Sequence, residues 1–256
     1  IFTDALNMKG VASFYEPGIV DVKALLAGND VLLFAENVPK AMEQIKLAIA
    51  KGQVTQEDID ARCKKILKAK FWCGLNNKQY VNPKHLYEDL NNKASFVMNS
   101  KLAEASATLL KNEKLLLPLQ RLDTMKIIEV SIGDEKANVF STTLNKYAKV
   151  SHVGISHDAT KKERDTLFAK LKNYNLVILQ LSKTSYRPAK NYSCTDGSIE
   201  LISKICEQKN TIACLNSNPY LINKLENINK AKAILCLYED NEFSQKAGAE
   251  AIMGAI

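Results

Sequence analysis

Several features are missing from this 256-residue sequence, and each absence narrows what the chain can be. No apolar run approaches the length that crosses a bilayer, so we expect no membrane span. No secretory signal peptide is visible either. That second absence carries little weight, because the chain begins within what looks like a core strand. We therefore expect a longer protein, in which an export signal would precede Ile1.

The six cysteines show no CxxC pair and no zinc spacing. Cys214 and Cys236 lie in apolar runs and are predicted to be small core residues. A chain of this size does not need disulfides, so the redox compartment stays open. No GxGxxG or GxxxxGK[ST] segment occurs, which argues against a cradle for nucleotide phosphates. Internal repeats and low-complexity segments are also missing.

The composition that is present describes a soluble globular chain, with 46% hydrophobic and 25% charged residues. The formal net charge is +7, and the densest basic patch is Lys64, Lys65, Lys68 and Lys70 on one predicted helix. No aromatic residues are interleaved with these lysines. A solvated helix face explains them better than a nucleic-acid groove, so we expect no nucleic-acid partner.

The first four residues, Ile1-Phe2-Thr3-Asp4, lead from two apolar side chains into a polar turn. This pattern is typical of the carboxyl end of a buried strand that presents one carboxylate. In parallel α/β folds the reacting groups lie at such ends. Asp4 could equally be the N-cap of the next helix, since Asp accepts bonds from free helical N–H groups. Spacing alone favours the cap.

Residues 1 to 75 continue as strand, helix, strand and two longer helices. The apolar run 30–34 is predicted as a strand buried on both faces. A helix over 20–26 ends at Gly28, and another over 39–51 buries Met42, Ile45, Ala48 and Ile49. Thr55 and Asp58 predict a capping box for the next helix, with Ile59, Cys63, Ile66 and Leu67 on its apolar face. Two strands cannot close a barrel, so this part packs on another part or ends a larger domain.

Residues 76–93 are rich in Asn and Lys and are predicted to be a linker. After a helix over 94–110, strands alternate with helices, which predicts a parallel sheet covered on both faces. The predicted strands are 126–132, 149–153, 176–181, 211–215 and 233–238, after a short extended segment at 115–119. The predicted helices are 136–147, 161–173, 197–208, 219–228 and 244–253.

The histidines give weak signals for chemistry. His85 and Glu88 supply two metal ligands without a third, so surface residues are the better interpretation. His152 and His157 lie near Ser and Asp residues, but no nucleophile elbow is present and a structural role is favoured. Asp134 and Asp240 are too scattered for the acidic cluster of a receiver domain.

Several segments together resemble glycoside hydrolase family 3, most closely its bacterial β-N-acetylglucosaminidases. The matching segments are 2–10, 24–33, 48–52 and 66–70, which resemble the closing part of the family's barrel. Leu109-Leu110-Lys111-Asn112 followed by Leu117-Pro118-Leu119 resembles the entrance to its carboxy-terminal domain. The resemblance implies an α/β fold throughout: the carboxy-terminal portion of a (β/α)8 barrel over 1–75, the linker 76–93, and a parallel-sheet α/β sandwich domain over 94–256.

The resemblance also implies that Asp4 is the nucleophile of a retaining glycosidase. Such an enzyme needs an ionised carboxylate aimed at the anomeric carbon and an acid about 5 Å away. Many β-glucosidases of the family take that acid from a glutamate in the second domain. The corresponding loop here, 182–198, contains no glutamate before Ser198, and its Asp196 is predicted to be a helix N-cap. The N-acetylglucosaminidase branch instead uses a His–Asp pair on a barrel loop that would precede Ile1.

The expected function is therefore retaining hydrolysis of terminal N-acetylglucosamine from cell-wall fragments by the intact protein. No metal and no organic cofactor are implied, and the expected partners are a carbohydrate substrate, the rest of the barrel and a domain fused after Ile256. The cell envelope or periplasm is favoured over the cytoplasm. The 256-residue chain itself is expected to be inactive. The alternatives are a β-glucosidase of the same family and a non-catalytic module that binds a carbohydrate or a partner.

Overall fold

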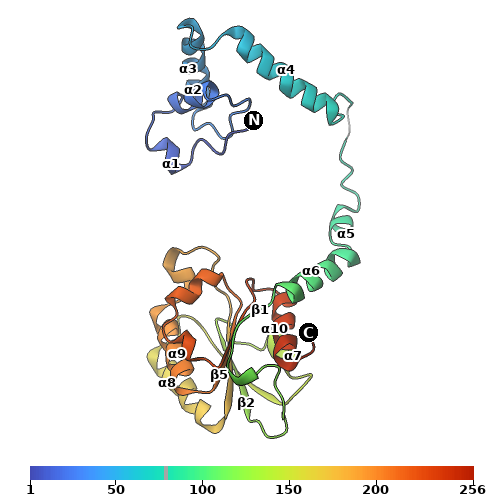
Figure 1. Cartoon of the computed structure of the whole chain (residues 1–256), viewed down its shortest axis with the longest axis vertical. Helices are drawn as coiled ribbons and strands as arrows, with labels where there is room; N and C mark the ends of the chain where they lie inside the picture. Colours follow the sequence, from blue (N-terminus) through green and yellow to red (C-terminus); the bar gives the residue numbers. More distant parts are fainter. Residues whose placement is uncertain (78–79) are drawn as a thin grey trace. The chain divides into compact units, whose positions relative to one another are not determined.

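The computed structural model describes residues 1–77 and 80–256, which form two compact units, Ile1–Lys84 and His85–Ile256 (Figure 1). Within these described ranges, no helix combines the length and the apolar character that a membrane crossing requires. The prediction of an α/β fold is confirmed. The two units are built differently and are described separately.

The first unit consists mainly of helices whose ends follow local sequence signals. They are α1 Lys9–Ala12, α2 Ile19–Leu26, α3 Val38–Ala50 and α4 Gln56–Trp72. The predicted capping box is confirmed: the Thr55 hydroxyl accepts from the Asp58 amide at 3.1 Å, and the Asp58 carboxylate accepts from the Thr55 amide at 3.2 Å. Asn37 caps α3 by accepting from the Lys40 amide. Helix α2 packs against α3.

The buried strand predicted over 30–34 is wrong in this chain. Among the described residues its pairing is one parallel bridge between Phe2 and Val31, and Leu33 and Phe34 are exposed. Ile1 and Phe2 are also exposed, so the opening segment is not a buried strand either. An apolar run becomes buried only where other elements cover both its faces, and the bridge supplies a neighbour on one edge.

The predicted apolar faces of the two long helices are also partly wrong. Met42 on α3 is exposed, and so are Cys63 and Leu67 on α4. Ala41 and Ala48 are the buried residues of α3. Helical periodicity therefore located the helices correctly, while the burial of each face was decided by packing.

The second unit is built on a six-stranded sheet formed by the described residues, in the order β1-β6-β5-β4-β2-β3. All neighbours are parallel except β1, which runs antiparallel to β6. The strands are β1 Thr108–Asn112, β2 Ile127–Ile132, β3 Val150–Ile155, β4 Leu176–Leu181, β5 Thr211–Leu215 and β6 Ala233–Cys236. Strands β4 and β5 have the predicted bounds, because continuous apolar runs are typical of strands covered on both faces.

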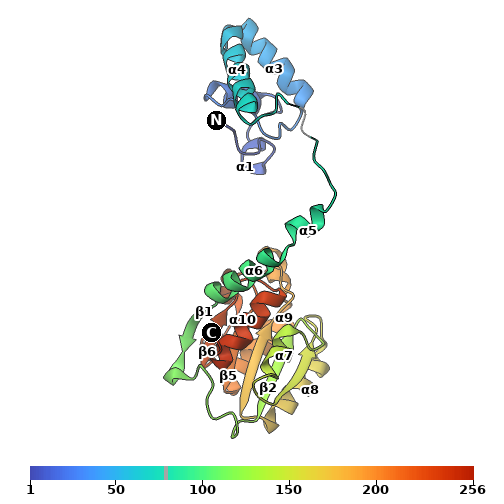
Figure 2. The ribbon, with the colours of Figure 1, turned by 90° about the vertical axis from the view of Figure 1, so that its right-hand side faces the viewer.

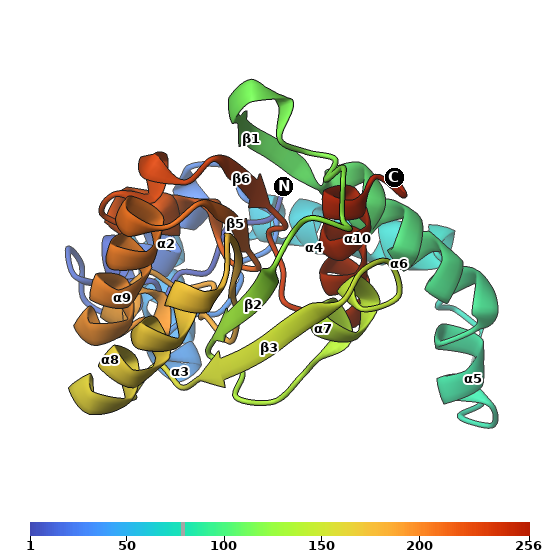
Figure 3. The same cartoon turned by 90° about the horizontal axis from the view of Figure 1, so that it is seen from below.

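Helices cover both faces of this sheet, as Figure 3 shows, with α8 and α9 on one side and α7 and α10 on the other. The bounds are α5 Leu86–Leu90, α6 Lys93–Ser106, α7 Val139–Leu144, α8 Lys161–Lys170, α9 Asp196–Gln208 and α10 Glu242–Met253. Helix α10 lies beside α7 and α6 (Figure 2), and the Phe96 and Phe243 rings meet edge-on at 5.4 Å. Two separate cores result, one on each face of the sheet.

Three predictions in the second unit are wrong in detail. The helix expected over 94–110 ends at Ser106, because the chain from Thr108 pairs with β6 as an edge strand. Leu115, the first residue of the extended segment expected over 115–119, instead ends the 3-10 turn η1, Glu113–Leu115. The helix expected over 219–228 is instead two 3-10 turns, η4 Pro219–Lys224 and η5 Ile228–Lys230. Asn227 lies between them at a φ of 57°, which interrupts an α-helix.

Candidate active site

The segment that carries Asp4 lies beside the segment that follows α2. The Thr3 amide donates to the Val31 carbonyl at 3.1 Å, and the Leu6 amide donates to the Leu33 carbonyl at 3.0 Å. The Thr3 side chain joins this ladder, because its hydroxyl accepts from the Leu33 amide at 2.8 Å. Leu6 is buried and anchors the far end of the segment. The backbone on both sides of Asp4 is therefore held in place.

Asp4 itself is exposed, and its carboxylate accepts a hydrogen bond from the Ala5 amide at 2.8 Å. The alternative role as a helix cap does not apply. Helix α1 begins at Lys9, and its N-cap is Met8, which makes no side-chain capping bond. The carboxylate therefore turns onto the amide of the next residue, on a segment fixed by the ladder to residues 31–33.

A second carboxylate in this unit, Asp30, fastens α4 to the same region. Its Oδ1 accepts from the Lys65 ammonium at 2.6 Å, and this hydrogen bond lowers the Asp30 pKa to about 2. Arg62 on α4 also donates to the Asn29 carbonyl. Two of the basic residues on α4 thus bind the loop before Val31, which positions the neighbour of the Asp4 segment.

Asp21 is a buried carboxylate that sequence reasoning missed. Its side chain accepts from the Gly18 amide at 3.2 Å, and its other oxygen, Oδ1, has no hydrogen-bond partner within the described ranges. Gly18 has a φ of +93°, and a Cβ there would lie 2.8 Å from the Lys40 carbonyl oxygen. The spacing Gly18-x-x-Asp21, with a carboxylate at the third helical residue, is the signal that could have revealed this bond to the N-cap amide.

The polar residues of the second unit form a cluster around a buried carboxylate on β2. Glu129 is fully buried, contacts His152 Nδ1 through Oε2, and accepts from the Ser141 hydroxyl at 3.0 Å. The Ser141 hydroxyl also lies 3.3 Å from His152 Nδ1. The hydrogen bond to Glu129 raises the pKa of His152.

This cluster cannot act as a Ser-His-Glu triad. In a triad the imidazole uses one nitrogen for the acid and the other for the nucleophile. Here both partners meet Nδ1. His157, the second histidine considered, donates through Nε2 to the Ser182 carbonyl at 2.9 Å and braces a loop. The structural interpretation of both histidines therefore agrees with the geometry.

The loop 182–198 ends in a helix cap, one residue earlier than predicted. Thr195, not Asp196, is the N-cap of α9, and its hydroxyl accepts from the Ser198 amide at 3.2 Å. Asp196 lies in the first helical turn, where a carboxylate favours the positive end of the helix dipole. Burial raises the pKa of Cys194 in the same loop to about 11, so its thiol is not a nucleophile at neutral pH.

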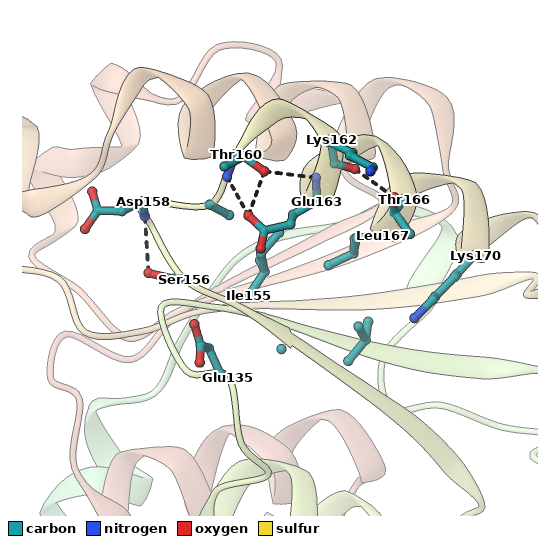
Figure 4. Close-up of a pocket in the computed structure, with 13 residues that line it drawn as sticks. Glu135, Ile155, Ser156, Asp158, Thr160, Lys162, Glu163, Thr166, Leu167 and Lys170 are labelled. Atoms are coloured by element: carbon teal, nitrogen blue, oxygen red, sulfur yellow. Dashed lines mark hydrogen bonds between the residues drawn. The ribbon is translucent and has the colours of Figure 1, made fainter.

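A groove of about 830 Å³ runs between the edge strand β3 and helix α8 (Figure 4). Acidic residues line one end of it and Lys170 lines the other. The described residues contain no group of three His, Cys, Asp or Glu side chains that could hold a metal ion. The second unit thus offers a groove and a polar cluster, while Asp4 lies in the first unit.

Comparison with known proteins adds evidence about the family. Residues 1–69, which include Asp4, match the model of the glycosyl hydrolase family 3 N terminal domain. A protein of Formosa agariphila named "Putative beta-xylosidase" is 27% identical over 125 residues, which are 48% of this chain. These matches support glycoside hydrolase family 3. The chain spans only 16% of the length of that relative.

Solved structures of two glycosidases share the fold of this chain. A family 3 β-N-acetylglucosaminidase from Paenibacillus sp. aligns with a TM-score of 0.71 and 20% identity, over 100% of this chain and 49% of that one. A β-glucosidase from Listeria innocua, solved with gluconolactone, aligns with a TM-score of 0.71 and 17% identity, over 99% of this chain and 38% of that one. At these identities the likeness establishes the fold alone.

Proposed function

We propose that the intact protein is a retaining β-N-acetylglucosaminidase of glycoside hydrolase family 3 that acts on cell-wall sugars, with Asp4 as its nucleophile. The observation that carries this proposal is the position of Asp4 on a backbone fixed by the ladder to residues 31–33, inside the segment that matches the family model. A nucleophile needs a rigid backbone, because a small displacement of the carboxylate from the anomeric carbon strongly lowers the reaction rate.

In the proposed reaction the Asp4 carboxylate attacks the anomeric carbon as the leaving oxygen takes a proton from an acid. A covalent glycosyl-enzyme forms, and water then hydrolyses it with retention of configuration. In the structure the carboxylate accepts a hydrogen bond from the Ala5 amide.

We further propose that residues 1–75 complete a barrel in the intact protein, with 76–93 as linker and 94–256 as the carboxy-terminal domain. The exposed apolar side chains of Ile1, Phe2 and Phe34 support this proposal, because the strands of a barrel are covered on both faces. The acid/base would come from residues other than these 256. For that reason the chain alone should not turn over substrate.

The choice of sugar rests on the loop 182–198 and on one structural relative. Before Ser198 this loop holds Asp196 as its acidic residue, and that residue lies in the first turn of α9. A glutamate acid in the second domain, as in many β-glucosidases of the family, is thus not supplied by this loop. The Paenibacillus relative is an N-acetylglucosaminidase, whereas the Listeria relative is a β-glucosidase, which remains the second candidate.

The decisive experiment uses the intact protein with an aryl N-acetylglucosaminide. We expect Asp4→Asn to lower kcat on the order of 10⁴-fold, since single members of a covalent catalytic set have effects of this size. Asp123→Asn, the same change at an exposed turn residue of the other unit, should leave the rate unaltered. Azide should restore turnover to Asp4→Ala by replacing the missing carboxylate, and the glycosyl azide formed should have inverted configuration.

Full activity in Asp4→Asn, or an inverted sugar product from the unaltered enzyme, would contradict the role of Asp4. Faster turnover of the matching glucoside or xyloside would contradict the preference for N-acetylglucosamine. It would not contradict the assignment of the protein as a glycosidase. For the non-catalytic alternative, the expected result would be binding of the sugar without turnover by the intact protein.

A further inference from the structure

The two edges of the sheet differ in how they are protected. Edge strand β1 has a register shift between Leu109 and Lys111, and the Lys111 ammonium donates to the carbonyls of Asn229 and Ala231, each at 2.8 Å. Bulges and lysines of this kind discourage pairing with another chain. Edge strand β3 pairs with β2 in unbroken register from Val150 to Ile155 and contains no charged or proline residue other than its partly buried His152.

The backbone direction shows which groups β3 presents at its outer edge. The Ile155 carbonyl accepts from the Gly133 amide at 2.8 Å, so the polar groups of Ile155 point towards β2. In a strand successive residues alternate, so Val153 also points towards β2. His152 and Gly154 therefore direct their N–H and C=O groups away from the sheet. These four groups form a short template for a further strand.

The groove along this edge has opposite charges at its two ends. Glu135, Asp158 and Glu163 line the end where β3 finishes, and Lys170, at the end of α8, lines the other (Figure 4). Lys162 on the first turn of α8 offsets part of the acidic end. Val153, Ile155 and Leu167 supply an apolar wall between the two ends. A strand lying here antiparallel to β3 would best carry basic groups where β3 ends and acidic groups where β3 begins.

We propose that a second copy of this chain occupies the groove, its β3 pairing antiparallel with the first β3 about a two-fold axis near Val153. His152 of each copy then faces Gly154 of the other, and the outward backbone groups satisfy one another. The two-fold axis places Lys170 of each copy near the acidic end of the other, so the charge pattern is complementary to itself. A pairing of this kind is isologous and closes as a dimer.

The first test is the oligomeric state of the full 256-residue chain. We expect a reversible dimer in sedimentation at concentrations up to about 100 µM, a range that covers weak biological interfaces. Val153→Lys should raise the dimer Kd at least tenfold, because it sets two ammonium groups facing each other across the axis. Val153→Thr keeps the branched shape without the charge and should change Kd less than threefold. A chain that stays monomeric, or a dimer insensitive to Val153→Lys with the fold intact by circular dichroism, overturns the proposal.

The second test uses the charged ends. Lys170→Glu should weaken the dimer about tenfold, and adding Asp158→Lys should restore it, because the double variant reverses both ends. Lys46→Glu on the exposed face of α3 changes the net charge equally and serves as the control. In hydrogen exchange, the amides of His152 and Gly154 should gain protection as the dimer forms. Two results would contradict a second copy as the occupant. One is that the amides of His152 and Gly154 gain protection only when an unrelated extended peptide is added, and the other is that the double variant does not regain dimer affinity.

Discussion

The two units use apolar side chains in opposite ways. In the second unit Ile178 and Leu179 on β4 are fully buried, whereas in the first unit Phe71 on α4 is 67% exposed and Trp72 is 87% exposed. Both units nevertheless have well-capped helices, as the boxes at Thr55 and Thr160 show. Capping signals therefore define where a helix begins, while burial of its side chains depends on the elements packed against it.

The largest effect expected from this comparison concerns truncation of one phenylalanine in each unit. Phe140→Ala should lower the free energy of unfolding of the second unit by about 4 kcal/mol, because Phe140 is fully buried. Phe71→Ala should change the first unit by less than about 0.5 kcal/mol. Urea unfolding followed by hydrogen exchange resolves the two units. Equal losses of unfolding free energy in both units would show that Phe71 is buried in solution and would contradict the difference between the units.

An intermediate effect separates two glycines with similar backbone angles. Gly133, after β2, has a φ of +107°, and a Cβ there would lie 2.2 Å from the Ser182 carbonyl oxygen. Gly28 has a φ of +93° with nothing within 4 Å. We expect Gly133→Ala to cost about 3 kcal/mol from strain and overlap, and Gly28→Ala about 1 kcal/mol from strain alone. Chemical unfolding of both variants measures the difference, and similar costs would refute the role of close packing at Gly133.

The smallest effect is a pH dependence confined to the second unit. The pKa of His152 is raised in the folded state by its hydrogen bond to Glu129. The stabilisation that this bond gives the folded state is therefore fully present below about pH 6.5, the pKa of a histidine in the unfolded chain. It is lost as the pH rises through the pKa of His152 in the folded state. Thermal unfolding across this range should show the loss, and Glu129→Gln should flatten it. If stability still depends on pH in the same way in Glu129→Gln, other titratable groups cause the effect.

Predictions from the sequence succeeded where local or strongly periodic signals existed. The bounds of β4 and β5, the capping box at Thr55 and the end of α2 near Gly28 are confirmed. They failed where another element decides the conformation. Residues 108–110 were predicted to end a helix but belong to β1, which pairs with β6, and the run 30–34 was predicted to be a buried strand but is not one.

The same division applies to the candidate site. Thr3-Asp4 could be singled out from the sequence, because two apolar residues before a carboxylate indicate the end of a strand. Whether Asp4 caps a helix or carries a free carboxylate could not be decided from the sequence, because the answer depends on where α1 begins. Asp21, Asp30 and Glu129 were missed because their partners, apart from Gly18, are distant in the sequence: Lys65 lies 35 residues from Asp30, and His152 lies 23 residues from Glu129.

The sequence alone was enough to predict the alternation of strands and helices after residue 126, the helix caps and the resemblance of the first part to a glycosidase barrel. These depend on spacing and on interactions within a few residues. The packing of distant segments was needed to show three other features: β1 closes one edge of the sheet in antiparallel pairing, β3 is the opposite edge strand among the described residues, and the backbone on either side of Asp4 is held by Val31 and Leu33. Such features depend on contacts between distant segments, which form only when packing offsets the entropy of bringing those segments together.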